Sequence, residues 1–217
     1  FTMATKDEIL TRLLKEENYV SGEELARQTG VSRAAVWKAI KSLKKSGYDI
    51  EGVTKCGYKL KQNNSLVTAE GVKALLEKDI EVTHFDTVDS TNTYCKRLLA
   101  DGKQGEFLVT AAKQTAGRGR QGKSFYSPSE TGIYFSLVIR PDTSLQNAVT
   151  ATTAAAVAVC KAIEKTTDLK PKIKWVNDVY LNGKKVCGIL TEATTDFESG
   201  TVDSVIIGIG INISTTK

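Results

Sequence analysis

The sequence predicts an α/β (α+β) protein in which a winged helix-turn-helix precedes a larger mixed-sheet domain. Three short amphipathic helices and two strand-like segments occupy residues 1–62. A polar stretch at 63–67 follows, and residues 68–217 then alternate longer helices with strands that are joined by hairpins. Hairpin-linked strands with interspersed helices indicate a mixed sheet, and not a regular doubly wound one.

Composition excludes several classes of protein. The 217 residues are 41% hydrophobic and 25% charged, which is typical of a globular protein of one or two domains. The most apolar run, 148–160, is interrupted by threonines and falls short of the roughly 20 residues of a membrane span. We therefore expect no membrane association and a cytoplasmic location, with Phe1 and Thr2 ahead of Met3 derived from a vector. The four cysteines form no C-x-x-C pair, which favours reduced thiols, and a lone histidine, His84, argues against a zinc site or a Ser-His-Asp triad.

The N-terminal helices are bounded by capping signals. Residues 5–8 and 21–24 each form a capping box, and Ser32 caps a third helix that is expected to reach Ser46. The short turn at 29–31 between the second and third helices is the spacing of a helix-turn-helix. Two strand-like segments follow, at 48–53 and 57–61, and supply the wing.

The third helix and the wing carry most of the positive charge. Between residues 33 and 61 there are eight basic and two acidic residues, which give a net charge of +6. The whole chain has a net charge of +5, so the remainder is close to neutral. Such a basic region predicts a polyanionic partner, although a solvated basic face is the plain alternative. Trp37 falls outside the apolar stripe of the third helix; a place in the core stays open for it, and it is not counted as a base-reading residue. The residues predicted to contact operator DNA are Ser32, Arg33, Lys38, Lys41 and Lys55.

The second domain is predicted element by element. Val72, Leu75 and Leu76 form the apolar face of a helix over 68–78, and Ser90 caps a helix that reaches about residue 99. Asn182-Gly183 is a strong hairpin signal. The other expected elements are strands near 82–88, 106–114, 132–140, 172–176 and 205–213, a helix over 145–166, and the hairpin strands 179–181 and 185–192.

The segment 117–124, Gly-Arg-Gly-Arg-Gln-Gly-Lys-Ser, stands out because it holds three glycines and three cations. It fits both the phosphate-loop pattern and the dinucleotide-binding pattern G-x-G-x-x-G. Each pattern requires a helix directly after the glycines, since the helix N-terminus holds the phosphates. A turn and a β-strand at 132–140 follow instead, so we reject both patterns. A glycine–arginine loop between two strands remains, either as a solvated turn or as a site for an anionic ligand.

Four segments together resemble the biotin protein ligases, in particular the bifunctional branch that also represses biotin genes. They are Asp-Ser-Thr-Asn at 89–92, Gln-Thr-Ala-Gly-Arg-Gly-Arg at 114–120, Lys-Trp-Val-Asn-Asp at 174–178 and Gly-Ile-Gly-Ile-Asn at 208–212. Three positions depart from the family pattern: Val176 stands for a proline, Gln121 for a basic residue and Phe125 for a tryptophan. Members of the family continue into a small C-terminal β-barrel, so the resemblance implies that the chain, which ends at Lys217, lacks that part.

The resemblance implies a biotin/lipoate-ligase-like catalytic domain and a two-step reaction. ATP and Mg²⁺ activate biotin to biotinyl-5′-AMP, and the biotin is then transferred to a lysine of a biotin carboxyl carrier protein. The adenylate-bound homodimer represses by binding operator DNA. The resemblance assigns catalysis to Lys174, Arg118 and Arg120. It assigns biotin binding to these three residues and to Ser90, Thr91, Asn92, Gln114 and Gly119. It assigns nucleotide binding to Arg118, Arg120, Phe125, Asn177 and Asn212, and it makes Asp178 a Mg²⁺ ligand.

Three other functions stay open on the sequence alone. A non-catalytic biotin-sensing repressor would keep the pocket without ligating biotin. A lipoate ligase shares the catalytic architecture, but it is not expected to carry the N-terminal helices and the Gly-Arg-Gly-Arg loop. A phosphate-loop NTPase with a DNA-binding head requires a helix after Ser124.

Overall fold

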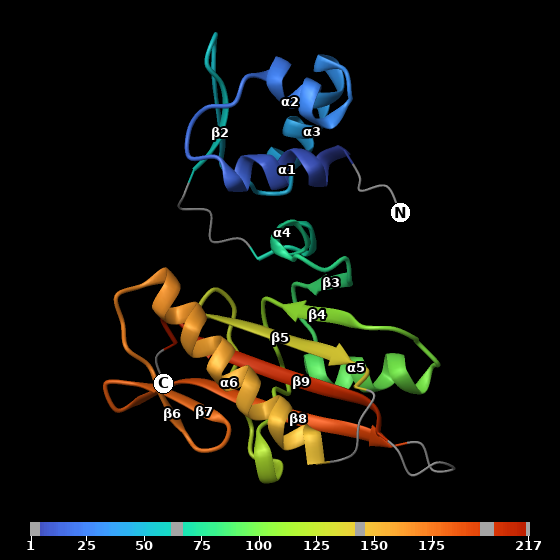
Figure 1. Cartoon of the computed structure of the whole chain (residues 1–217), viewed down its shortest axis with the longest axis vertical. Coiled ribbons are helices and arrows are strands. Elements are labelled where there is room, and N and C mark those ends of the chain that lie inside the picture. Colours follow the sequence, from blue (N-terminus) through green and yellow to red (C-terminus); the bar gives the residue numbers. More distant parts are fainter. Residues whose placement is uncertain (1–4, 62–66, 142–145, 196–201, 216–217) are drawn as a thin grey trace. The chain divides into compact units, whose positions relative to one another are not determined.

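The computed structural model describes residues 5–61, 67–141, 146–195 and 202–215, and the chain forms two compact units (Figure 1). The first unit is Phe1–Asp79 and the second is Ile80–Lys217. Most of the predicted linker at 63–67 lies outside the described residues.

The first unit is a winged helix-turn-helix, as predicted. Ser21 and Ser32 cap the second and third helices by accepting hydrogen bonds from the backbone N–H of Glu24 and Ala35. Gly30 ends the second helix in the left-handed conformation that glycine adopts without strain. The helices pack around one apolar core, and the wing hairpin runs beside them (Figure 1). The elements are α1 (Thr5–Lys15), α2 (Gly22–Thr29), α3 (Arg33–Lys45) and the antiparallel pair β1 (Ile50–Val53) and β2 (Gly57–Leu60).

This unit extends beyond the predicted boundary at residue 62, because helix α4 (Ala69–Leu75) packs against α1. Lys6 forms an ion pair with Glu70 at 2.7 Å, and the Tyr48 hydroxyl is hydrogen-bonded to Thr68, which caps α4. The predicted apolar face of this helix is not buried as a whole, since Leu75 is 65% exposed. The sequence pattern shows which residues share a helix face, but not which element covers that face.

The second unit is built on a seven-stranded sheet with the order β3-β4-β5-β9-β8-β7-β6. Only the β3–β4 pair is parallel among the described strands, so the predicted mixed sheet is confirmed. The strands are β3 (Glu81–Phe85), β4 (Phe107–Ala111), β5 (Gly132–Ile139), β6 (Lys172–Lys174), β7 (Asp178–Leu181), β8 (Lys184–Thr195) and β9 (Val202–Asn212).

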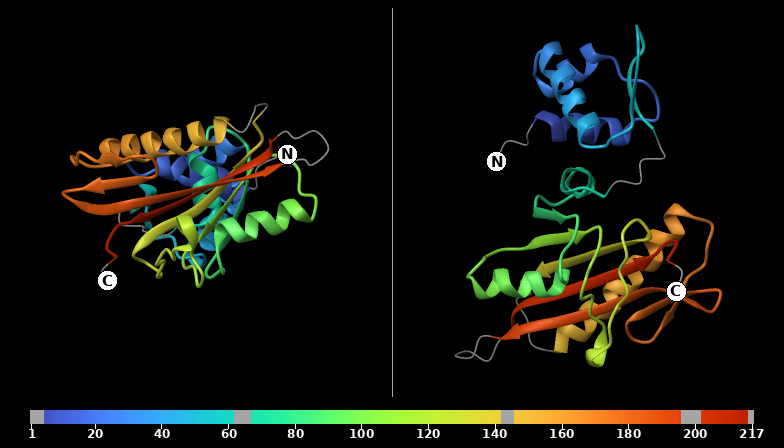
Figure 2. Two further views of the ribbon diagram at one scale, coloured as in Figure 1. Left: turned by 90° about the horizontal axis from the view of Figure 1, so that it is seen from below. Right: turned by 180° about the vertical axis from the view of Figure 1, so that it is seen from behind.

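Two helices cover the opposite faces of this sheet, α5 (Thr91–Ala100) on one and α6 (Gln146–Thr166) on the other (Figure 2). Strand β9 shows the period of two that such a layer requires. Ile206 packs into the cluster that contains Cys95 of α5, whereas Val205 and Ile207 pack into the cluster that contains α6 residues. Among the described helices, none is both long and apolar enough to cross a lipid bilayer.

The glycine–arginine segment 117–124, called the Gly-Arg loop from here on, is followed by strand structure, as predicted. The described chain forms one short 3₁₀ turn at Arg120–Gly122 and then reaches β5 through isolated bridges, with no helix between. The phosphate-loop and dinucleotide patterns therefore lack the helix N-terminus that they need. The predicted hairpin at 182–183 is also confirmed, because both Asn182 and Gly183 have the positive φ of a type I′ turn.

The exposure of α4 generates a stability prediction. Leu43 is 1% exposed in the core of the first unit, and Leu75 is 65% exposed. We expect Leu43→Ala to lower the free energy of unfolding by about 2–5 kcal/mol, because it leaves a cavity. The matched Leu75→Ala variant is expected to change it by less than about 0.5 kcal/mol. Urea unfolding, followed by Trp37 fluorescence in a Trp175→Phe background, measures both; equal losses would contradict this packing.

Candidate functional site

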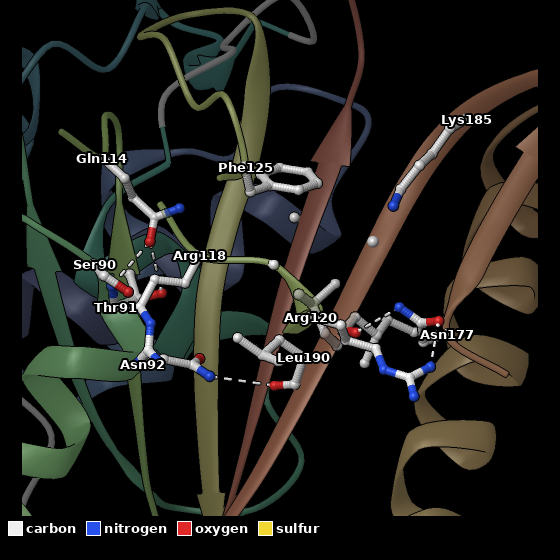
Figure 3. Close-up of a pocket in the computed structure, with 16 residues that line it drawn as sticks. Ser90, Thr91, Asn92, Gln114, Arg118, Arg120, Phe125, Asn177, Lys185 and Leu190 are labelled. Atoms are coloured by element: carbon white, nitrogen blue, oxygen red, sulfur yellow. Dashed lines mark hydrogen bonds between the residues drawn. The ribbon is translucent and has the colours of Figure 1, made fainter. Parts of the chain in front are cut away.

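The second unit holds a pocket between the N-terminus of α5, the Gly-Arg loop and strands β8 and β9. Together with the solvent at its mouth, the empty space of this pocket is about 460 Å³. Figure 3 shows Gln114 and Thr91 on one side, Arg120 with Asn177 on the other, and Phe125 and Lys185 pointing into the space between. The lining residues are Ser90, Thr91, Asn92, Gln114, Arg118, Gly119, Arg120, Phe125, Asn177, Lys185, Gly188, Ile189, Leu190, Gly208, Ile209 and Gly210.

The floor of the pocket is made of glycines. Gly188 of β8 and Gly210 of β9 face each other in the register of the sheet, and Gly208 follows on the same side of β9. A Cβ added to Gly210 would lie 2.4 Å from the Phe125 ring, and one added to Gly208 would lie 2.1 Å from Asn92 Oδ1. The missing side chains therefore let Phe125 and Asn92 approach the sheet closely, and both residues line the pocket beside the glycines.

One wall is polar and joined by hydrogen bonds. Gln114 Oε1 accepts from the backbone N–H of Thr91 at 2.9 Å, and Gln114 Nε2 donates to Ser127 Oγ at 2.9 Å. Buried Ser136 is hydrogen-bonded to Thr91 Oγ1 at 2.7 Å and donates to Asn92 Oδ1 at 2.6 Å. Ser90 uses its hydroxyl to cap α5, where it accepts from the N–H of Thr93. This network fixes the groups that the resemblance assigns to biotin.

Asn92 contributes to the shape of the pocket more than to its hydrogen-bonding capacity. Its Nδ2 donates to the carbonyl oxygen of Leu190 at 3.2 Å and to Glu192 Oε2 at 2.9 Å, and its Oδ1 accepts from Ser136. Both amide hydrogens are thus donated inside the protein. We expect Asn92 to form a fixed wall and not to donate to a ligand.

The structure brings both predicted arginines to the pocket. Arg118 lies 3.4 Å from Glu192, and Arg120 donates to Asn177 Oδ1 at 3.1 Å. Asn177 in turn donates to the carbonyl oxygen of Ile189 at 3.1 Å, which ties the loop to β8. The pocket therefore presents two guanidinium groups, which bind carboxylate and phosphate oxygens well.

Lys174 is not brought to the pocket, and Lys185 is. The Lys174 side chain is exposed and lies over the Tyr180 ring, with 5.4 Å from Nζ to the ring centroid. Lys185, which the sequence analysis did not assign, lines the pocket and forms an ion pair with Asp178 at 2.7 Å. Lys185 is the first residue of the second strand of the predicted hairpin, and that position was the available signal.

A register irregularity explains why strict alternation misses Lys185. Along β8, Cys187 is paired with Val179 and Lys185 with Tyr180, so Val186 is an extra residue. Such a bulge shifts the alternation of side chains by one position. Lys185 therefore lies on the face of Gly188, whereas a regular strand would place it on the face of Cys187, which packs toward α6.

The remaining predicted residues differ in their distance from the pocket. Phe125 lies over the glycine floor. Asn212 does not line the pocket, and its Nδ2 donates to the carbonyl oxygen of Lys185 at 3.4 Å. The described residues contain no cluster of three or more His, Cys, Asp or Glu side chains arranged for a metal, so Asp178 offers a single carboxylate. That fits a Mg²⁺ ion held mainly by the phosphates of a nucleotide.

The carboxyl group of Glu192 was also missed by sequence reasoning. Burial opposes its ionisation, but hydrogen bonds from Lys96 and Asn92 outweigh burial and hold the pKa of Glu192 below its usual value. Elsewhere, all four cysteines are free, as predicted, and burial raises the pKa values of the Cys95 and Cys187 thiols to about 12.

In the first unit, the predicted DNA-contacting residues lie on an exposed basic face. Arg33, Lys38 and Lys41 are exposed on α3, and Arg33 and Lys55 line a hollow between this helix and the wing. Trp37 does not lie in the core: it is 57% exposed, lines the same hollow, and has Lys41 Nζ 5.2 Å from its ring centroid.

Comparison with known proteins accounts for both units. The profile of the biotin/lipoate A/B protein ligase family matches residues 84–212, which span the sheet and the pocket. The chain belongs to this family. A helix-turn-helix domain profile matches residues 5–59.

Curated relatives combine the two units. The chain is 40% identical to the bifunctional ligase/repressor BirA of Bacillus spizizenii over 199 residues, 90% of this chain and 61% of the relative. It is 32% identical to the protein of the same name from Escherichia coli, over 94% of this chain and 63% of the relative. The chain thus spans about three-fifths of the length of the curated relatives that it matches.

Solved structures of biotin/lipoate ligases resemble the second unit. The biotin protein ligase of Aquifex aeolicus in complex with biotin and ATP is 32% identical, with a TM-score of 0.50, over 63% of this chain and 53% of that one. The biotin acetyl coenzyme A carboxylase synthetase of Helicobacter pylori, with bound biotinylated ATP, is 25% identical, with a TM-score of 0.52, over 64% of each chain.

The glycine floor generates a prediction for this family member. A Cβ at position 208 would collide with Asn92, whose amide is held by three hydrogen bonds, whereas a Cβ at 210 would meet the ring of Phe125, which can turn away. We expect Gly208→Ala to reduce the free energy of unfolding by about 1–3 kcal/mol and Gly210→Ala to reduce it less. Urea denaturation compares them with Gly22→Ala, where a Cβ has 3.5 Å to its nearest neighbour. If Gly208→Ala unfolds like the Gly22→Ala control, Asn92 is not rigidly held.

Proposed function

We propose that the second unit activates biotin with ATP to biotinyl-5′-AMP and transfers the biotin to a lysine of a biotin carboxyl carrier protein. The observation that carries this proposal is the convergence of Arg118, Arg120 and Lys185 on a glycine-floored pocket with a fixed polar wall. The relatives that are named as biotin ligases, and the related structures with biotin and ATP, support the choice of substrates.

The first step joins two anions. A carboxylate oxygen of biotin attacks the α-phosphorus of ATP, the bond from that phosphorus to the bridging oxygen breaks, and pyrophosphate leaves. Fixed cations lower the barrier because they are already oriented toward the charge that develops. We assign this role to Arg118, Arg120 and Lys185, with Lys185 held in place by Asp178. Mg²⁺ that enters with ATP would neutralise phosphate charge, and Asp178, whose carboxylate also pairs with Lys185, is the residue that would hold it.

The second step consumes the mixed anhydride. The amine of the carrier lysine attacks the biotinyl carbonyl carbon, an amide bond forms, AMP leaves, and the amine loses its proton. Until the carrier arrives, the reactive adenylate must be retained. Charge-assisted hydrogen bonds from Arg118 and Arg120 to its phosphate, worth roughly 1.5–3 kcal/mol each, serve that purpose.

We further infer that the first unit binds operator DNA and that an adenylate-bound homodimer represses biotin genes. The exposed basic face of α3 and the wing supports DNA binding, and the bifunctional names of the relatives support repression. Two copies would place two such helices on paired half-sites. A biotin-sensing repressor without ligase activity is the alternative, and it would bind biotin without catalysing biotin-dependent ATP–pyrophosphate exchange.

The exchange assay decides which lysine takes part. We expect Lys185→Ala to reduce the rate of biotin-dependent ATP–pyrophosphate exchange by on the order of 10²–10³, because it removes a fixed cation from the pocket. Lys174→Ala removes the same charge from the neighbouring hairpin but leaves the pocket lining intact, so we expect a nearly unchanged rate. The reverse result would restore the role that the resemblance assigned to Lys174. No exchange by the unmodified protein would favour the non-catalytic repressor.

DNA binding has its own prediction. We expect Lys41→Gln to lower the slope of log affinity against log salt by about one unit, because one phosphate contact is lost. Lys15→Gln, at an exposed lysine of α1, is the matched control and should keep the slope. Binding to duplexes selected from a random-sequence pool is followed by Trp37 fluorescence in a Trp175→Phe background. If both variants have the same slope, Lys41 of α3 does not contact a DNA phosphate.

A further inference from the structure

Glu192 lies behind the pocket on β8 and contacts two of its lining residues. Only 17% of its side chain is exposed. Its oxygens are approached by three donors: Asn92 Nδ2 at 2.9 Å, Lys96 Nζ at 2.7 Å and Arg118 NH1 at 3.4 Å. Asn92 and Lys96 are one turn apart on α5, so they present their side chains to Glu192 from the same helix face.

The carboxylate determines how the Asn92 amide is oriented. Glu192 Oε2 and the Leu190 carbonyl oxygen can only accept hydrogen bonds, so the edge of the amide that faces them must be the NH₂ group. The Asn92 oxygen then faces Ser136, which donates to it at 2.6 Å. This orientation keeps the amide against Gly208 in the floor, where no Cβ fits.

The same carboxylate forms an ion pair with Arg118 of the Gly-Arg loop. The first residue of the 114–120 motif, Gln114, is bonded to Thr91 and to Ser127, and Thr91 is linked through Ser136 to Asn92. Glu192 extends this chain of contacts to Arg118. A network of hydrogen bonds and one ion pair therefore joins Gln114, the N-terminus of α5 and Arg118, which lines the pocket.

We propose that Glu192 is a positioning residue for the ligand pocket. It fixes the Asn92 amide and holds the Arg118 guanidinium where both line the pocket. The inference rests on the proposed function, because it identifies the ligand of this pocket as biotin. It adds a residue that contacts neither substrate and acts through two that line the site.

A glutamine cannot replace this carboxylate, although it has nearly the same shape. All three partners of Glu192 are donors, so the NH₂ group of a glutamine would face either Asn92 Nδ2 or the two cations. Either orientation opposes donor to donor. Glu192→Gln thus changes the polarity of the network with minimal change in volume.

The experiment measures biotin affinity and the kinetics of exchange in Glu192→Gln. We expect the Kd for biotin, determined by calorimetry, and the KM for biotin to rise about 10- to 100-fold, the effect of losing a charge-assisted hydrogen bond. The KM for ATP should be unchanged. The matched control is Asp203→Asn, which removes the carboxylate of another close ion pair, with Arg140 at 2.6 Å and outside the pocket. It should leave all three constants unchanged.

Other outcomes overturn the proposal. Unaltered biotin constants in Glu192→Gln would show that Asn92 and Arg118 are positioned without it. A lower melting temperature and a smaller active fraction, with normal constants for the remaining enzyme, would give Glu192 a structural role only. Failure of the unmodified protein to bind biotin would overturn the proposed function itself, whereas binding without exchange would leave the calorimetric comparison valid for a non-catalytic sensor.

Discussion

The second unit depends on a steric constraint: strands β8 and β9 carry glycines where Phe125 and Asn92 lie against the sheet. Side chains normally fill the space between a sheet and its covering layer to the density of a crystal. At Gly188, Gly208 and Gly210 the sheet surface is bare backbone, and added Cβ atoms would collide with Phe125 or Asn92. These two side chains can therefore approach the sheet closely and line the pocket together with the glycines, and strand hydrogen bonds make this floor rigid.

Rigidity on the polar side of the pocket comes from groups that satisfy one another. Burying a polar group without a partner costs free energy, so a buried network is stable only when its members are paired. A series of hydrogen bonds links Gln114 to Thr91, Thr91 to Ser136 and Ser136 to Asn92, so each of these groups has a partner. The series ends at the charged carboxylate of Glu192, which accepts from Asn92. The wall of the pocket is thereby fixed before a ligand arrives, which reduces the ordering cost of binding.

The cations of the pocket have fewer partners than the side chains of its wall. Among the described residues, Arg118, Arg120 and Lys185 each contact one side-chain acceptor, at 3.4, 3.1 and 2.7 Å. An anionic ligand can replace such partners more easily than it can replace a buried hydrogen-bond network. The charge of the site is therefore available to an anionic ligand, while the shape of the site stays the same.

The sequence by itself determined whatever depends on neighbours along the chain. Ser21 and Ser32 cap their helices, Asn182-Gly183 closes a hairpin, and no helix follows the Gly-Arg loop, because these features arise from local backbone geometry and hydrogen bonding. The motifs also predicted that Gln114 and Arg118 share a site, and both residues line the pocket.

Only the tertiary structure decided which side chains face which surroundings. An extra residue in β8 turns Lys185 toward the pocket, and Lys174 lies over Tyr180 on the neighbouring hairpin. Likewise, Glu192 finds its partners about 75 to 100 residues away in the chain. Periodicity gives the relative direction of side chains within one element, but bulges and long-range contacts set what each of them meets.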